Sequence, residues 1–347
     1  MTTVVGASIY PNSAAALRLR VSPVIDVLRR RGVDATVWSF LRDGDLDRWL
    51  SGRSSRVAAA CRGLESLPSA RRWASTCEAL LLQREALPLD SLLLEKAVLR
   101  RKRPIIWDVD DALWLRSAPG RQFVRGRASK YEFLARHASE VWAGNRTVAD
   151  WATRTGASKV EIVPTTVEVP PMVDHHVRED DLLVWIGTPS TGPFIEKLLR
   201  ELGPDLEGWR VLVVGARVQA PSSLTVEQSS WSPEAEVKAL RRATVGLYPL
   251  DLAHPAVLGK SALKCVLYMA NGIPVVATPT PSNLAVMADG VEGFFAQAAE
   301  EWLDRLSLLR EDVLRQRIAT AGHRRALRDF DTRTWGVELA RRIEGYL

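Results

Sequence analysis

The sequence predicts an α/β protein with two Rossmann-like domains, whose parallel sheets face a cleft between the domains, and with a helical tail at the C-terminal end. Its 347 residues are enough for two domains, since a domain averages roughly 150 residues. Short β-rich segments alternate with helical patterns in two separate series, which is typical of βαβ units and parallel sheets. A proline-rich stretch at 164–171 separates the two series. Ligands of such paired domains bind in the cleft by default.

The first series begins with a β-rich run at 3–8 that ends in small residues. A helical pattern follows at 14–31 and stops before Gly32, because glycine readily adopts the conformation that ends a helix. Further strands of this series are predicted at 34–40, 79–83, 104–107, 140–143 and 160–163.

The second series starts with a strand at 181–187 and continues with strands at 210–214, 245–248 and 274–277. Periodicity is lost before this series, which predicts a linker, so we expect an N-terminal domain at 1–172 and a C-terminal domain at 173–325. A last helix, 326–347, is expected to pack back on the N-terminal domain. From Glu300 onward the pattern is helical, with apolar residues at helical spacing, namely Trp302, Leu306, Leu309, Val313 and Ile318.

The composition excludes several classes of protein. With 46% hydrophobic and 25% charged residues, the chain is neither disordered nor a collagen-like or disulfide scaffold. The net charge of +6 comes without a nucleic-acid-binding pattern, so no nucleic-acid partner is expected, while peripheral contact with an anionic membrane stays open. The three Cys lack metal-ligand spacing and indicate free thiols. We predict no signal peptide and no transmembrane segment, and therefore a cytoplasmic protein of unassigned oligomeric state.

Two lysines lie four residues apart in the second half of the chain. If residues 261–270 form a helix, Lys260 lies at its N-terminus and Lys264 lies one turn further on. A helix N-terminus with lysines can hold a phosphate group, and Gly259 lets the backbone approach an anion closely. The alternative is a solvated helix start.

The pattern around these lysines is GK-x3-K-x3-YMA-x-G-x-PVVA, preceded by W-x2-E-x-E from Trp231 and by YPLD from Tyr248. It resembles the C-terminal domain of family 4 glycosyltransferases, in a bacterial branch. Residues 181–191 resemble the first strand and donor loop of that domain, and Glu301 with Trp302 matches its late EW. Residues 141–145 and 162–165 resemble the last strands of the N-terminal domain.

The resemblance implies the GT-B fold and transfer of a hexosyl-type sugar, with retention, from a nucleoside diphosphate sugar to an acceptor hydroxyl. It favours a UDP-sugar as donor, implies no cofactor and no bound metal, and fits the biosynthesis of an envelope glycan or a specialised metabolite. The family's glutamate pair would fall at Gly259 and Leu267, and neither is acidic. Donor binding is therefore expected from Gly187, Thr188, Ser190, Thr191, Gly215, Trp231, Gly259, Lys260, Ser261 and Lys264.

Three carboxylates, Asp108, Asp110 and Asp111, follow the strand predicted at 104–107. They resemble the D-x-D of haloacid-dehalogenase-type phosphatases, the metal site of GT-A glycosyltransferases, and an acidic loop on the acceptor side of the GT-B branch. A capping loop is a fourth interpretation. We take them as catalytic candidates that bind or deprotonate the acceptor hydroxyl, with Arg18 and Asn145 as acceptor-binding candidates. Two alternatives remain: a Mg-dependent phosphatase that uses Asp108 and Asp110, and a non-catalytic protein with a degenerate glycosyltransferase fold.

Overall fold

The computed structural model describes residues 3–50, 58, 61, 63–86, 92, 96, 103–115, 124–172 and 178–347. The chain forms two compact units. The first comprises Met1–Thr166, Gly259–Ser261 and Thr332–Leu347, and the second comprises Val167–Leu258 and Ala262–Asp331. The domain boundary predicted after residue 172 adjoins residues 173–177, which lie outside the described part of the chain.

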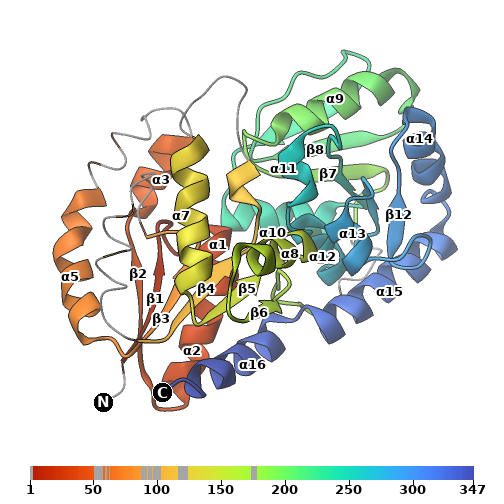
Figure 1. The fold of residues 1–347 in the computed structure, drawn as a ribbon. Coiled ribbons are helices and arrows are strands. Elements are labelled where there is room, and N and C mark those ends of the chain that lie inside the picture. The colour runs from red at the N-terminus through yellow and green to blue at the C-terminus, as the bar shows by residue number, and fades with distance from the viewer. Residues whose placement is uncertain are drawn as a thin grey trace. The chain divides into compact units, whose positions relative to one another are not determined.

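The first unit contains a six-stranded sheet with the order β2-β1-β3-β4-β5-β6 (Figure 1). All its strand pairs are parallel. The order changes direction between β1 and β3, which is the point where open α/β sheets bind ligands, beyond the carboxyl ends of the strands. The strands are β1 (Thr3–Ser8), β2 (Asp34–Ser39), β3 (Ala79–Gln83), β4 (Ile105–Val109), β5 (Glu140–Ala143) and β6 (Val160–Ile162).

The helical stretch predicted at 14–31 is divided at Val21 into α1 (Ala15–Arg20) and α2 (Ser22–Arg30). Pro23 lies in the first turn of α2, where its missing N–H costs nothing. Gly32 follows with a φ of 85°, as expected of a residue that ends a helix. In the described part of this unit the other helices are α3 (Asp43–Leu50), α5 (Leu67–Thr76), α7 (Val124–His137), α8 (Arg146–Thr155) and α16 (Thr332–Glu344), with 3-10 turns at Leu64–Ser66 and Leu113–Leu115.

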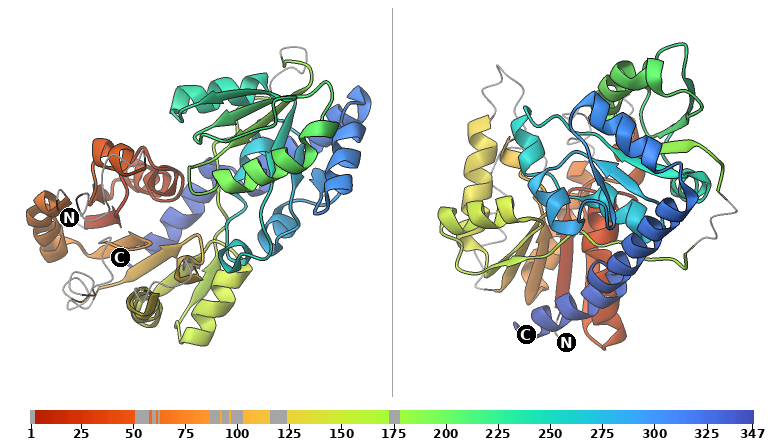
Figure 2. Two further views of the ribbon diagram at one scale, coloured as in Figure 1. Left: turned by 90° about the horizontal axis from the view of Figure 1, so that it is seen from above. Right: turned by 90° about the vertical axis from the view of Figure 1, so that its right-hand side faces the viewer.

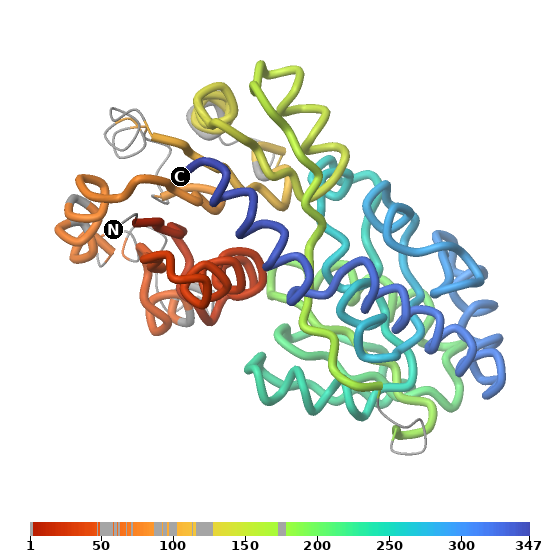
Figure 3. The backbone as a smooth tube through the Cα atoms, turned by 90° about the horizontal axis from the view of Figure 1, so that it is seen from below, coloured from red at the N-terminus to blue at the C-terminus, as the bar shows by residue number. Residues whose placement is uncertain are grey.

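Helix α16 packs against α2, and Figure 3 shows the C-terminal segment running beside the red helices of the same unit. Buried Glu140 holds the segment that follows α16, because the hydroxyl of Tyr346 donates to its Oε2 at 2.8 Å. Lys159 Nζ reaches the same oxygen at 2.8 Å, and Trp142 Nε1 donates to Oε1 at 2.9 Å. The last helix of the chain is thus anchored at the amino end of β5.

The second unit contains another six-stranded parallel sheet, with the order β12-β11-β10-β7-β8-β9. Its first strand, β7, lies between β8 and β10, so the order changes direction at β7 and β10. Figure 2 shows the helices that pack on this sheet. The strands are β7 (Leu182–Ile186), β8 (Arg210–Val214), β9 (Thr225–Ser229), β10 (Val245–Tyr248), β11 (Val275–Ala277) and β12 (Gly293–Phe295).

The helices of the second unit are α9 (Gly192–Leu202), α10 (Pro233–Arg242), α11 (Pro255–Leu258), α12 (Leu263–Ala270), α13 (Pro281–Val286), α14 (Ala299–Leu308) and α15 (Asp312–Asp329), with a 3-10 turn at Gly203–Asp205. Of the apolar residues at helical spacing, Trp302, Leu306, Leu309 and Ile318 are buried. Val313 is 75% exposed. The helical spacing of the apolar residues is interrupted between the end of α14 and the start of α15. Residues on one face of α14 are therefore not aligned with those on one face of α15.

Among the described residues, none of the helices combines the length and the apolar character that a membrane crossing requires.

Candidate functional site

The loop that follows β7 carries exposed hydroxyl groups. Thr188 Oγ1 lies 2.9 Å from Ser190 Oγ, and Thr191 Oγ1 accepts a hydrogen bond from the Thr188 backbone N–H at 3.2 Å. A Cβ on Gly187 would lie 2.3 Å from the Trp185 ring. The sequence therefore needs glycine here, and the loop turns tightly beyond the strand with its hydroxyls in solvent.

Gly215 ends β8 in the left-handed conformation, with a φ of 90°. A side chain here would meet the carbonyl oxygen of Gly187 at 2.2 Å, so the loops after β7 and β8 are in direct contact. Trp231 follows β9, is half-buried, and donates from Nε1 to Glu236 Oε2 at 2.9 Å. That hydrogen bond fixes the indole beside the carboxyl ends of three neighbouring strands.

Lys264 lies in the first turn of α12, in the corner between β7 and β10. Its Nζ is 5.6 Å from the centre of the Trp185 ring and 5.0 Å from that of Tyr248. The Ile186 N–H donates to the Tyr268 hydroxyl at 3.0 Å, which ties α12 to β7. Burial raises the pKa of Tyr268, so this hydroxyl stays protonated. The ammonium group thus occupies the point where the order of the second sheet changes direction.

The helix predicted to begin at Ser261 begins two residues later, at Leu263. Gly259–Ser261 belongs to the first unit. The Ser261 N–H donates to Asp111 Oδ1 at 2.8 Å, so this amide, expected at the phosphate site, is bound to a carboxylate. The carbonyl oxygen of Gly259 accepts from the Asn145 side chain at 3.1 Å.

Asp108 is 1% exposed and forms an ion pair with buried Arg20. Arg20 Nε lies 3.0 and 2.8 Å from the two carboxylate oxygens, and the guanidinium also donates to the carbonyls of Val163 and Pro164 at 3.1 Å. Burial raises the pKa of Asp108, and the charge of Arg20 opposes that rise. The pair joins α1, β4 and the segment after β6.

Asp110 is held by Arg84, whose Nε and Nη2 donate to its two oxygens at 2.6 and 2.7 Å. Arg84 follows β3 with a φ of 60°, an unusual conformation for a residue other than glycine. Its guanidinium lies 5.5 Å from the centre of the Tyr10 ring. Burial opposes the ionisation of Asp110, but the charge and hydrogen bonds of Arg84 outweigh it and lower the pKa of Asp110.

The candidate residues therefore fall into two groups. The first unit brings together Asp108, Asp110, Asp111, Asn145, Gly259 and Ser261, with Lys260 in the same segment as the last two. The second unit brings together Gly187, Thr188, Ser190, Thr191, Gly215, Trp231 and Lys264. Arg18 is half-buried in α1, two residues before Arg20.

Asn145 performs three local tasks. Its Oδ1 accepts from the Val148 N–H and caps α8, while its Nδ2 donates to the carbonyls of Asp110 and Gly259 at 3.3 and 3.1 Å. Tyr10 and Arg84 were not among the residues that the sequence singled out. The signal that could have found them is their place after β1 and β3, where the order of the first sheet changes direction.

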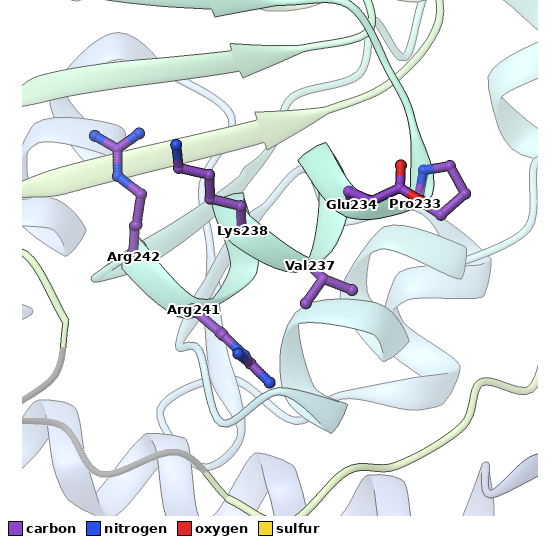
Figure 4. A pocket seen from close by; sticks show the side chains of 6 residues that line it. All are labelled: Pro233, Glu234, Val237, Lys238, Arg241 and Arg242. Carbon is purple, nitrogen blue, oxygen red and sulfur yellow. The ribbon is translucent and has the colours of Figure 1, made fainter.

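Helix α10 borders a surface hollow of ≈ 580 Å³ in the second unit. Figure 4 shows Arg242 and Lys238 on one side of the helix and Arg241 on the other. Arg242 is paired with Glu179 and with Glu227, the latter at 2.9 Å. The residues that line the hollow are Pro233, Glu234, Val237, Lys238, Arg241 and Arg242. In the described part of the chain, His, Cys, Asp and Glu form no group of three that could hold a metal ion.

The chain is similar to one family model and to several solved structures. Residues 191–341 match the family model described as glycosyl transferase-like. The structure of Anabaena HepE in complex with UDP and glucose is 16% identical and has a TM-score of 0.72, with 99% of this chain and 100% of that chain covered. Sucrose-phosphate synthase from Thermosynechococcus elongatus is 11% identical, with a TM-score of 0.73 and 99% of both chains covered.

A glycosyltransferase from Rickettsia africae is 12% identical, with a TM-score of 0.68 and coverage of 99% of this chain and 98% of that chain. No curated protein matches the sequence. The family match supports the predicted glycosyltransferase class. The structural matches confirm the predicted fold: the chain has the GT-B fold of glycosyltransferases.

Proposed function

We propose that the protein is a family 4-like glycosyltransferase that moves a sugar from a nucleoside diphosphate sugar, with UDP-sugars favoured, to an acceptor hydroxyl. The observation that carries the proposal is Lys264, which lies where the order of the second sheet changes direction. The glycosyl transferase-like match over residues 191–341 includes this lysine. Structures of HepE hold UDP or UDP-glucose, which favours uridine for this chain.

The donor diphosphate gains negative charge as the bond to the sugar breaks. Positive charge and hydrogen-bond donors aimed at the leaving group lower the barrier to that step. Lys264 and Lys260 would supply the charge, and the hydroxyls of Thr188, Ser190 and Thr191 would supply neutral donors. Since neutral donors with one or two cations can hold a diphosphate, the chain can bind the donor diphosphate without the family's glutamate pair. Trp231 would offer a flat face for the base, and Gly215 packs closely beside it, since a Cβ there would lie 3.2 Å from Trp231 Cβ.

The acceptor hydroxyl needs a hydrogen-bond partner near the first sheet. Asp108 is poorly placed for this, because Arg20 holds its two oxygens and its exposure is 1%. Arg84 also holds both oxygens of Asp110, but Asp110 is 7% exposed and its lowered pKa keeps it ionised at neutral pH, so it is the better candidate. A carboxylate with a low pKa is a weak base, so we assign Asp110 to orienting the hydroxyl, with Arg18 as a further acceptor contact.

Retention of configuration, a cytoplasmic location, action without a cofactor, and a role in envelope-glycan or specialised-metabolite biosynthesis belong to the same proposal. The phosphatase alternative requires Asp108 as a nucleophile. An aspartate whose oxygens both face Arg20 cannot attack a phosphate without first breaking that pair. Turnover of a donor sugar by the protein would exclude the non-catalytic alternative.

The test is release of the nucleoside diphosphate from UDP-, GDP-, ADP- and TDP-sugars, with a panel of hydroxyl acceptors. We expect turnover with one base, and NMR of the product should give the anomeric configuration. Lys264→Met should lower donor kcat/KM by about 10- to 100-fold, because a hydrogen bond to a charged group contributes about 1.5–3 kcal/mol. The control is Lys197→Met, on the exposed side of α9. Turnover that survives Lys264→Met, or phosphatase activity lost in Asp108→Asn, would overturn the proposal.

A further inference from the structure

The segment Gly259–Ser261 belongs to the first unit, although Leu258 before it and Ala262 after it belong to the second. Its backbone is held on both sides of Lys260. The Gly259 carbonyl accepts from the Ala112 N–H at 2.8 Å and from Asn145 Nδ2 at 3.1 Å. Hydrogen bonds therefore fix the peptide that precedes Lys260.

The Ser261 N–H, on the other side of Lys260, donates to Asp111 Oδ1 at 2.8 Å. Asp111 is itself oriented by Arg84, with 3.7 Å between Oδ2 and Nη2. Asp111 and Asn145 are 5% and 6% exposed, so these bonds are shielded from competing water. Because the three-residue segment is bonded at both ends, the backbone of its middle residue, Lys260, is held in place.

Gly259 fits this contact because it lacks a side chain. A Cβ here would lie 2.1 Å from the Ala112 Cβ, while the next nearest atoms, Ala112 Cα and N, would lie at 3.3 and 3.4 Å. The φ of Gly259 lies outside the left-handed region, so an alanine could adopt its backbone conformation. The requirement for glycine is therefore one of space, and a single methyl group of Ala112 imposes it.

We propose that Asp111, Ala112 and Asn145 form a clamp on Gly259–Ser261 that positions Lys260 for the donor diphosphate. Asp111 is then a positioning residue, and so is Asn145. The inference rests on the proposed function, because it takes the diphosphate as the ligand of Lys260.

The experiment is a four-protein cycle of wild type, Gly259→Ala, Ala112→Gly and the double variant. Gly259→Ala forces the segment away from Ala112, and we expect UDP affinity and donor kcat/KM to fall about tenfold or more, since a 1 Å misplacement can cost about 100-fold. Ala112→Gly removes the methyl group that the new Cβ would strike. The double variant should therefore recover to within about threefold of wild type. Gly345→Ala, at an exposed glycine near the C-terminus, is the matched control.

Asn145→Ser gives a second measurement that does not depend on a clash. Serine keeps the N-cap of α8 but removes the Nδ2 donor to Gly259, so UDP affinity should fall while circular dichroism stays that of wild type. Wild-type affinity in Gly259→Ala, or a double variant no better than Gly259→Ala, would overturn the clamp. Failure of the wild type to bind any nucleoside diphosphate would instead overturn the proposed function. In that case the Tm values of the four proteins test the clamp. The changes in Tm of the two single variants should not add up to that of the double variant.

Discussion

Arg20 and Asp108 provide a quantitative test of the first unit, through the variant Arg20→Leu. The guanidinium is buried and bonds to both oxygens of Asp108 and to the carbonyls of Val163 and Pro164. Leucine fills part of the space but leaves a carboxylate that is 1% exposed without its cation. The variant therefore buries an uncompensated charge.

Breaking a buried ion pair by removing one partner costs about 3–5 kcal/mol. In a unit of this size each kcal/mol lowers Tm by about 2–4 °C, so the Tm of Arg20→Leu should fall by roughly 6–20 °C. The loss should be smaller at acidic pH. Without Arg20 only the charge of Arg84 still opposes the rise that burial causes in the pKa of Asp108, so the carboxyl takes up a proton more readily as the pH falls and its buried charge disappears.

The assay is thermal unfolding followed by circular dichroism at about pH 7.5 and at about pH 5, since a buried carboxyl with a raised pKa is more protonated at the lower pH. The control is Arg146→Leu, which removes an exposed pair with Asp150 on α8 with side-chain exposures of 78% and 47%. Such pairs contribute about 0.3–0.5 kcal/mol. The double variant Arg20→Leu/Asp108→Leu should recover part of the loss. A fall in Tm no larger than that of the control, or one equal at both pH values, would refute the reasoning.

Three further predictions follow from other contacts. Gly215→Ala should weaken UDP binding at least tenfold in titration calorimetry, because its Cβ would lie 2.2 Å from the Gly187 carbonyl oxygen; unchanged affinity would contradict the packing of these two loops. Arg84→Gly removes the group that lowers the pKa of Asp110, so the acidic limb of the kcat/KM profile should move to higher pH, and an unmoved limb would exclude Asp110. Tyr346→Phe removes the hydroxyl bond to Glu140 and should cost about 1.5–3 kcal/mol in denaturant unfolding above pH 5. Because the pKa of Glu140 is lowered, that cost should shrink as the pH falls through this pKa and the carboxylate is protonated. A cost that does not depend on pH would contradict a hydrogen bond from Tyr346 to the ionised Glu140.

Much of the fold could be predicted from the sequence because buried parallel strands are short apolar runs. The strands at 79–83, 140–143, 210–214 and 245–248 have the predicted bounds. The strands β9 and β12 were missed for physical reasons. β9 is a partly exposed edge strand with the sequence TVEQS, which lacks an apolar run. β12 has three residues, too few to show a period.

The candidate site could be predicted only in part. The glycines, hydroxyls and lysines of the donor loops stand out because their residue types and spacing are unusual within a βαβ unit. The partners of the three aspartates could not be predicted in this way. Arg20 and Arg84 come from segments far from Asp108 and Asp110 in the sequence, and their pairing depends on strand order. Asn145 was recognised as a site residue, but its role as a cap and backbone donor depends on tertiary contacts.

Binding of UDP to Lys264 tests the central claim most directly, because the whole account depends on a diphosphate at that lysine. The measurement is isothermal titration of UDP into wild type, Lys264→Met and Lys197→Met, without added metal. We predict one site in wild type, an unchanged Kd in Lys197→Met, and a Kd raised about 10- to 100-fold in Lys264→Met. Equal affinity in all three proteins, or no binding of UDP, GDP, ADP or TDP to the wild type, would contradict the account.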